Sequence, residues 1–258
     1  MKIIKTLFLL LLCTAAFAQK KELPEDVVAS IKSRIEFGLT PSIVVGIIDK
    51  DGMHFYSFGT KTVGGEPVDE HSIYEIGSIS KTFTATLLAD NIVKGKMKVD
   101  DPISKYLPAS VKVPTYKGGG PPITLGHLSD HTSSMLRMPT NMPESDPTDP
   151  AADYTPELMY AFLSSYELPR EVGSEYEYSN FAVGVLGQIQ ALAAGTSYEE
   201  ALTSVITSPL KMKETAITLS PKMKENLAVG HSMGMPVNNW DLNAMQGAGG
   251  IRSSAHDM

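Results

Sequence analysis

The sequence predicts a mixed α/β fold of the α+β type, in which an N-terminal β-hairpin precedes a helix-rich region. Residues 42–48 form a short β-branched run, and after the turn at Asp51-Gly52 the apolar side chains alternate through residues 54–58. Apolar residues then recur at helical spacing through 79–94 and 181–194. These three patterns place a sheet layer first and a helical lobe after it.

The composition is that of an ordinary globular protein. The chain has 258 residues, of which 42% are hydrophobic and 20% charged, enough for one domain or two closely packed lobes. Its formal charge is −7, and without Lys2 and Lys5 the 22 basic residues fall to 20 against 29 acidic ones, or −9. No basic run is present, so a nucleic-acid partner is not expected.

Residues 1–18 are predicted to be a secretory signal peptide, and 19–258 the functional domain. Lys2 and Lys5 give a basic start, Leu7 to Leu12 an apolar core, and Ala16-Phe17-Ala18 a small-x-small cleavage site. The apolar run is too short for a membrane span, and no second run suggests an anchor. This pattern predicts a periplasmic or secreted bacterial protein.

The single cysteine, Cys13, lies inside this leader. Lipidation at Cys13 is not expected, because Leu10-Leu11-Leu12 lacks the small residues that precede a lipid-modified cysteine. The mature chain then contains no cysteine, so it needs no disulfide and cannot use a thiol nucleophile.

The remaining elements follow the same signals. Helices with apolar faces or capping residues are predicted over 25–37, 102–106, 123–132, from 155 and from 197. Residues 137–154 read as a long irregular loop, and 214–219 and 227–233 as short strands or extended segments. Gly247 to Ile251 is predicted to be a glycine-rich turn at which another segment of the backbone can approach closely. Ser253 and Ser254 look like caps of a helix that Met258 cuts off, which predicts a truncated chain.

The stretch Gly77 to Phe83 carries the strongest chemical signal. Ser78 stands at the start of the helix predicted over 79–94, and Lys81 follows on the same helix face. A helix start favours a developing alkoxide, and burial can lower the pKa of a lysine toward that of a general base. The alternative is an N-capping Ser78 followed by an exposed Lys81.

Two other motifs are weaker. The Gly118-Gly119-Gly120 run is followed by no Gly-Lys-Ser/Thr, so a phosphate-binding loop is rejected. His127 and His131 have the spacing of a zinc motif, but Leu128 replaces its glutamate, so helix packing and capping are favoured. No metal or cofactor is expected.

The ordered motifs resemble the serine β-lactamase/penicillin-binding protein superfamily, in its class C β-lactamase-like branch. The resemblance runs from about residue 25 to 258 and rests on Tyr74-Glu75-Ile76-Gly77-Ser78-Ile79-Ser80-Lys81, Ile123-Thr124-Leu125-Gly126-His127-Leu128 with His131-Thr132-Ser133, Tyr178-Ser179-Asn180, Pro209-Leu210-Lys211-Met212 and Gly249-Gly250-Ile251.

The resemblance implies roles for four residues. Ser78 would be the acylated nucleophile, Lys81 would help remove its proton, and Tyr178 would be the phenolic base and acid. Asn180 would hold the substrate amide and orient Lys81. A phenol pKa near 10 must be lowered by Lys81 and a second cation for this chemistry at neutral pH. The alternative for residues 178–180 is a turn with a helix cap at Asn180.

The resemblance implies the family fold: an α/β sandwich, in which an antiparallel sheet is flanked by helices, plus a helical lobe, with the nucleophile at their junction.

The sequence departs from the family pattern in three ways. The third family motif, Lys/His-Thr/Ser-Gly, is absent and is expected beyond residue 258, with the last sheet strands, the second cation and one oxyanion donor. Ser134 replaces the usual glycine after His-Thr-Ser. No match to the class A deacylating glutamate is found. The hairpin would then expose an edge that favours aggregation.

The expected function is hydrolysis by a secreted serine enzyme through an acyl-enzyme on Ser78, acting as a monomer on a small molecule, a β-lactam or a related amide or ester. The alternatives are a D-Ala-D-Ala carboxypeptidase or penicillin-binding protein, an esterase, and a non-catalytic homologue or inactive fragment.

Overall fold

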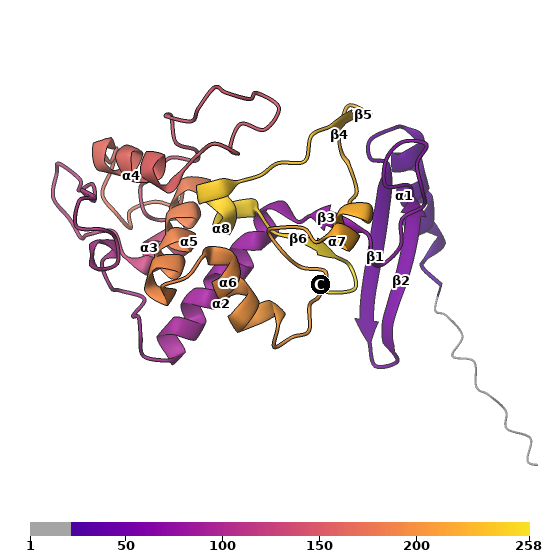
Figure 1. Ribbon diagram of the computed structural model, residues 1–258, viewed down its shortest axis with the longest axis horizontal. Coiled ribbons are helices and arrows are strands. Elements are labelled where there is room, and N and C mark those ends of the chain that lie inside the picture. Colours follow the sequence, from indigo (N-terminus) through magenta and orange to yellow (C-terminus); the bar gives the residue numbers. More distant parts are fainter. Residues whose placement is uncertain (1–21) are drawn as a thin grey trace, which may run out of the picture.

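The computed structural model describes residues 22–258 (Figure 1). The predicted signal peptide and Cys13 lie outside these residues. A β-hairpin with one helix occupies one end of the molecule, and the helical lobe occupies the other (Figure 1). Short strands lie between the two. No helix in this described part is long and apolar enough to span a bilayer.

The N-terminal layer forms as predicted. Helix α1 spans Glu25–Glu36, strand β1 spans Ser42–Asp49 and strand β2 spans Gly52–Gly59. The two strands pair antiparallel with Val45 opposite Tyr56. The turn between them is local, and Gly52 supplies the positive φ of 122° that it requires.

The helical lobe is built around α5, Asn180–Ala194. Ten of its residues are buried, because α2, α3, α6 and α8 pack around it. The other elements of the lobe are α2 Ser80–Val93, a 3₁₀ turn Ile103–Lys105, α3 Leu125–Ser129, α4 Pro156–Ser165, α6 Tyr198–Leu202 and a π-helical turn Thr203–Thr207.

The middle of the molecule contains short elements from distant parts of the sequence. They are β3 Ile73–Glu75, α7 Pro221–Glu225, β4 Gly230–Ser232, β5 Met235–Val237, a 3₁₀ turn Asn243–Met245, α8 Gln246–Gly249 and β6 Arg252–Ser254. Strand β3 pairs antiparallel with β6, and β4 with β5. The helix-cap prediction for Ser253 and Ser254 is wrong: both are buried in β6, paired with Tyr74 and Ile73.

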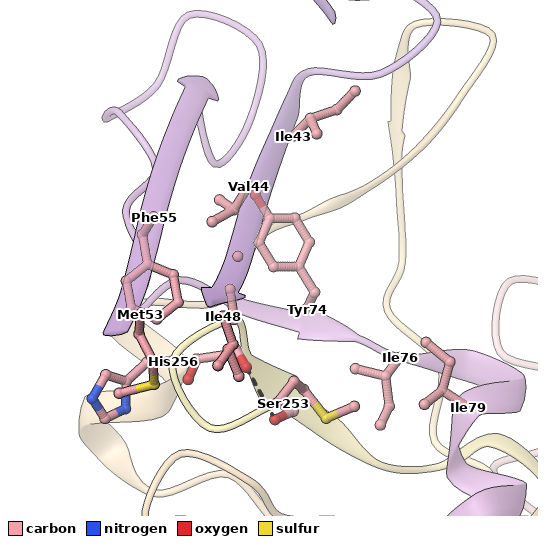
Figure 2. Close-up of a pocket in the computed structure, with 14 residues that line it drawn as sticks. Ile43, Val44, Ile48, Met53, Phe55, Tyr74, Ile76, Ile79, Ser253 and His256 are labelled. Carbon is pink, nitrogen blue, oxygen red and sulfur yellow. Dashed lines mark hydrogen bonds between the residues drawn. The ribbon is translucent and has the colours of Figure 1, made fainter. Parts of the chain in front are cut away.

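Within residues 22–258 the sheet layer consists of three separate two-stranded ladders. A pocket of about 540 Å³ lies between the β1–β2 hairpin and the β3–β6 ladder (Figure 2). Its walls are mainly apolar and include Ile43, Val44, Ile48, Met53, Phe55 and Ile76. The β1–β2 hairpin therefore presents apolar side chains to an open space instead of a continuous core.

Candidate active site

Ser78 lies in a 3₁₀ turn, Gly77–Ile79, immediately before α2. Gly77 has φ of 51°, the left-handed conformation that glycine adopts without a Cβ penalty. The turn is tied to the end of the chain, since the Ile76 N–H donates to the Ile251 carbonyl at 3.1 Å. No side chain caps this turn or α2, so the alternative of Ser78 as an N-cap is wrong.

Lys81 extends from the first turn of α2 into a ring of three acceptors. Its Nζ donates to Ser78 Oγ at 3.2 Å, to Asn180 Oδ1 at 2.8 Å and to the Ala248 carbonyl at 2.6 Å. Burial is the largest cause of a lowered pKa for Lys81, and the positive charge of Arg137 lowers that pKa further. The Lys81 side chain is therefore fixed in position, and its amine is less basic than that of a lysine in water.

Tyr178 completes the contact with the serine. Its hydroxyl donates to Ser78 Oγ at 2.5 Å. Two cations face its ring, with Lys81 Nζ 4.8 Å and the Arg137 guanidinium carbon 5.0 Å from the ring centroid. Burial raises the pKa of Tyr178, but interactions with Lys81, Ser78 and Arg137 lower it by more, so the phenol is more acidic than usual.

The start of α5 sets the positions of Tyr178 and Asn180. Ser179 is the N-cap: its Oγ accepts from the Ala182 N–H at 2.8 Å and donates to the Leu136 carbonyl at 2.8 Å. Asn180 is already helical, so the alternative of a cap at Asn180 is wrong by one residue. The cap places Tyr178 and Asn180 on either side of a buried serine, facing Ser78 and Lys81.

A strained segment, residues 131–137, supports this corner. His131 and Ser134 have φ of 64° and 63°, left-handed values that are uncommon for residues with a Cβ. His131 Nδ1 accepts from the Ser179 N–H at 3.1 Å, and its ring lies 4.6 Å from the Tyr178 ring. The Ser134 hydroxyl donates to the Arg170 carbonyl at 2.9 Å, which holds the serine that replaces glycine here.

His127 and His131 serve separate structural tasks. His127 forms a capping box with Thr124 at the start of α3, whereas His131 contacts Ser179 at the start of α5. Both contacts agree with the prediction that His127 and His131 act in helix capping and packing.

A cavity of about 440 Å³ opens beside Ser78. Ser78, Asn180 and Glu75 contribute its polar side chains, and its remaining lining is mostly apolar, from Met138, Met142, Pro150, Ala151, Trp240, Leu242 and Met245. The irregular loop predicted at 137–154 thus supplies part of the wall. A group that reaches Ser78 through this cavity would pack its apolar part against methionine and tryptophan.

The structure brings together all four predicted residues, Ser78, Lys81, Tyr178 and Asn180. It adds Arg137, which sequence reasoning missed because the second cation was assigned to a motif beyond residue 258. The only available signal was that Arg137 closely follows His131-Thr132-Ser133. The side chain of Arg137 is exposed, and no carboxylate pairs with it among the residues described.

A serine hydroxyl in contact with a lysine and a tyrosine at a helix start, between a sheet layer and a helical lobe, defines the class of active-site serine hydrolases. The chain belongs to the Beta-lactamase family, whose sequence model matches residues 31–258.

The similar proteins include a carboxypeptidase and a β-lactamase. The chain is 32% identical to the D-alanyl-D-alanine-carboxypeptidase/endopeptidase AmpH of Escherichia coli K12, covering 98% of this chain and 66% of that protein. It is 29% identical to a Beta-lactamase of the same strain, covering 98% and 65%. The chain therefore spans just under two thirds of the length of these relatives.

Solved structures confirm the predicted fold class. A Beta-lactamase/D-alanine Carboxypeptidase from Yersinia pestis, complexed with citrate, superposes with a TM-score of 0.77 at 28% identity, over 90% of this chain and 65% of that one. A class C beta lactamase from Rhodobacter sphaeroides gives a TM-score of 0.74 at 28% identity, over 90% and 62%.

Proposed function

We propose that this protein is a serine hydrolase that transfers an acyl group to water through a covalent intermediate on Ser78. The observation that carries the proposal is the contact of Ser78 Oγ with both Lys81 Nζ, at 3.2 Å, and the Tyr178 hydroxyl, at 2.5 Å. A serine alcohol is a weak nucleophile until a neighbouring base removes its proton, and both partners have lowered pKa values.

In acylation, Ser78 Oγ loses its proton to the Tyr178 phenolate or to neutral Lys81 as it attacks the substrate carbonyl carbon. The Ser78 N–H would be one oxyanion donor, as the family resemblance implies. When the tetrahedral intermediate collapses, the bond to the leaving nitrogen or oxygen breaks, and Tyr178 returns the proton to that atom. Asn180 keeps Lys81 in place and receives the acyl-side amide.

In deacylation, water replaces the leaving group. Tyr178 or Lys81 takes a proton from the water, which attacks the ester carbonyl, and the proton returns to Ser78 Oγ as the acid departs. The same groups thus act in both half-reactions. A single chain supplies all four side chains, so the monomer is the active unit in this proposal.

We propose a β-lactam or a D-alanyl peptide as the substrate class, with carboxylic esters as the alternative. The names of the two relatives support the first two substrates. The exposed guanidinium of Arg137, beside Tyr178 and without a carboxylate partner in residues 22–258, supports an anionic substrate. With the predicted signal peptide, this suits a periplasmic or secreted enzyme of the cell-wall space.

Labelling with a fluorescent penicillin, read by intact mass, tests the nucleophile. We expect one acyl adduct on the wild-type protein and none on Ser78→Ala. Ser208→Ala, which changes an exposed serine far along the chain, should label as wild type does. Equal labelling of wild type and Ser78→Ala would contradict the proposal. No labelling of either, together with no turnover of a D-Ala-D-Ala peptide or an ester, would favour a non-catalytic homologue.

The lifetime of the adduct separates the substrate classes. Rapid loss of the adduct with release of the opened lactam indicates a β-lactamase. A persistent adduct, together with release of D-alanine from a D-Ala-D-Ala peptide, indicates a carboxypeptidase. Turnover of an ester alone, with neither of these activities, would assign the protein to the esterases.

A further inference from the structure

A second group of chemically active side chains lies at the far end of the β3–β6 ladder, away from Ser78. His71 precedes β3, His256 follows β6, and Glu214 lies just before the segment that bridges to β6 at Ala216. One ligand atom from each of the three side chains lies within 4.8 Å of the others. None of these residues takes part in the proposed acyl transfer.

The strand register brings the three residues together. Ile73 pairs with Ser254, so continuing that antiparallel ladder by two residues on each side sets His71 opposite His256. The Glu70 carbonyl accepts from the His256 N–H at 3.0 Å, which extends the pairing in this direction. The two imidazole rings accordingly lie on one face, with centroids 4.9 Å apart.

The same logic places the carboxylate. Ala216 bridges antiparallel to Arg252, so Glu214 falls beside Ser254, where its carboxylate is near both histidines. Glu214 contacts His71 Nδ1 with both oxygens, at 3.1 and 3.0 Å, and accepts from the Ser254 hydroxyl at 2.7 Å. Its own N–H donates to Asp257 Oδ2 at 2.7 Å, which fixes the backbone that carries it.

The surroundings favour a cation. Asp69, Glu70 and Asp257 add negative charge around the imidazoles, and His256 Nδ1 lies 3.6 Å from an oxygen of Asp257. Glu214 is only 17% exposed, whereas His71 is 43% exposed and can turn toward a shared centre. Ligand atoms that lie about 2.0–2.1 Å from a tetrahedral ion are roughly 3.3 Å from one another. The three ligand atoms, now within 4.8 Å of one another, would therefore have to move closer together to bind it.

We propose that His71, Glu214 and His256 form a binding site for a divalent transition metal of the zinc class. Two imidazoles and one carboxylate are a ligand set that Zn²⁺ accepts in tetrahedral sites, with water as the fourth ligand. The Ser254 hydroxyl orients the carboxylate, the outer contact that such ligands usually have. The ion would join β3, β6 and the 214–216 segment, and would stabilise the layer that supports the Ser78 turn.

The competing arrangement is a plain ion pair. A protonated His71 that donates to Glu214 satisfies both groups without a metal, and this hydrogen bond to Glu214 raises the pKa of His71. A metal must displace this proton, so the apparent affinity should fall as the pH drops below neutrality. An ion pair predicts no saturable binding at any pH.

Isothermal titration of the purified protein, free of any histidine tag, with ZnCl₂ tests the proposal. We expect one ion per chain, a higher Tm with zinc, and visible d–d bands of tetrahedral geometry when CoCl₂ replaces ZnCl₂. His71→Ala, His256→Ala and Glu214→Gln should each weaken binding by at least about tenfold. His54→Ala is the matched control, since His54 also contacts a carboxylate, Asp49, at 3.3 Å but belongs to no group of three possible metal ligands within residues 22–258.

Circular dichroism of each variant separates loss of ligands from loss of fold. Folded variants that lose zinc binding while His54→Ala retains it support the site. Absence of one-to-one binding to the wild type, or binding that survives both histidine substitutions, would overturn it.

Discussion

At the scale of single residues, the candidate site depends on how the charges around Tyr178 balance. Its phenol lies between a half-buried Lys81 and an exposed Arg137, and the hydroxyl reaches Ser78. Lys81 is held by two acceptors besides the serine, so it can lose or gain a proton without leaving its place. The Arg137 side chain forms no hydrogen bond within residues 22–258, so its charge can be removed without breaking one.

We predict that Arg137→Gln shifts the pH dependence of acylation to higher pH. Removing this cation raises the pKa of both Tyr178 and Lys81, so less of either base is deprotonated at neutral pH. An exposed cation–π pair contributes about 0.5–1 kcal/mol, which corresponds to a roughly two- to fivefold slower acylation. Stopped-flow acylation rates measured across pH report the shift.

Arg34→Gln provides the control, because Arg34 lies on α1 and its loss should leave the profile unchanged. An unshifted profile in Arg137→Gln would show that Arg137 has no influence on the base.

At the scale of elements, the buried cap of α5 links the site to the helical core. Ser179 is fully buried, and its hydroxyl satisfies both the Ala182 N–H and the Leu136 carbonyl. Because Tyr178 and Asn180 flank this residue, the cap fixes both the helix start and two site residues. A helix cap on the surface lacks the second role.

We predict that Ser179→Ala lowers the free energy of unfolding by about 1–2 kcal/mol and also slows acylation. The first effect follows from the lost cap, and the second from a looser Tyr178. Urea denaturation and penicillin labelling measure the two.

Ser220→Ala, which removes the cap of α7, should lower stability by about 1 kcal/mol without slowing acylation. If Ser179→Ala and Ser220→Ala were acylated at equal rates, the cap of α5 would not position Tyr178, and the prediction would be wrong.

The crossing of α5 and α8 is a second element-scale constraint. A Cβ on Gly247 would lie 3.0 Å from Gly187 Cα and 3.1 Å from Thr84 Oγ1. Helix α8 also carries Ala248, whose carbonyl accepts from Lys81. Displacing α8 therefore moves an acceptor of the site lysine.

We predict that Gly247→Ala destabilises the fold by about 1–3 kcal/mol, as overpacking does, and reduces acylation. Gly95→Asn is the control, because a Cβ there meets nothing within 4 Å and asparagine tolerates the φ of 69°. Thermal unfolding and labelling of both variants check this. A Gly247→Ala protein with wild-type Tm would mean that the helices separate without cost.

The limits of sequence reasoning also follow from the elements. The β1–β2 hairpin and α5 could be predicted because their patterns are local. The β3–β6 ladder could not, since it joins Ile73 to Ser254 with three residues on each strand, too few to show a period. Ser78, Lys81, Tyr178 and Asn180 could be predicted from their motifs. Arg137 could not, because it follows a segment with left-handed φ at His131 and Ser134, a path that the sequence does not indicate.

At the scale of the whole molecule, the helical lobe is well packed and the hairpin end is open. Strand β1 pairs only with β2 in the described part of the chain, and its apolar residues line the pocket in Figure 2. Ile48 is 74% exposed and lies opposite Met53, which is 55% exposed. An apolar strand with an unpaired edge is a surface on which another chain can add a strand.

We predict that this chain associates in a concentration-dependent way through the hairpin, and that Ile48→Lys suppresses the association. A lysine on an edge strand opposes strand addition because its charge would have to be buried. Ile48 is already mostly in solvent, so the substitution should change the free energy of unfolding by no more than about 0.5 kcal/mol. Sedimentation velocity over a range of concentrations measures association, and urea denaturation measures stability.

Val63→Lys distinguishes the hairpin from exposed apolar surface in general. Val63 is 64% exposed but lies in the loop after β2, away from the pocket. If exposed apolar area alone drove association, the two lysine variants would suppress it equally. If the unpaired edge of β1 drives it, only Ile48→Lys acts, because only that lysine stands where an added strand would pair.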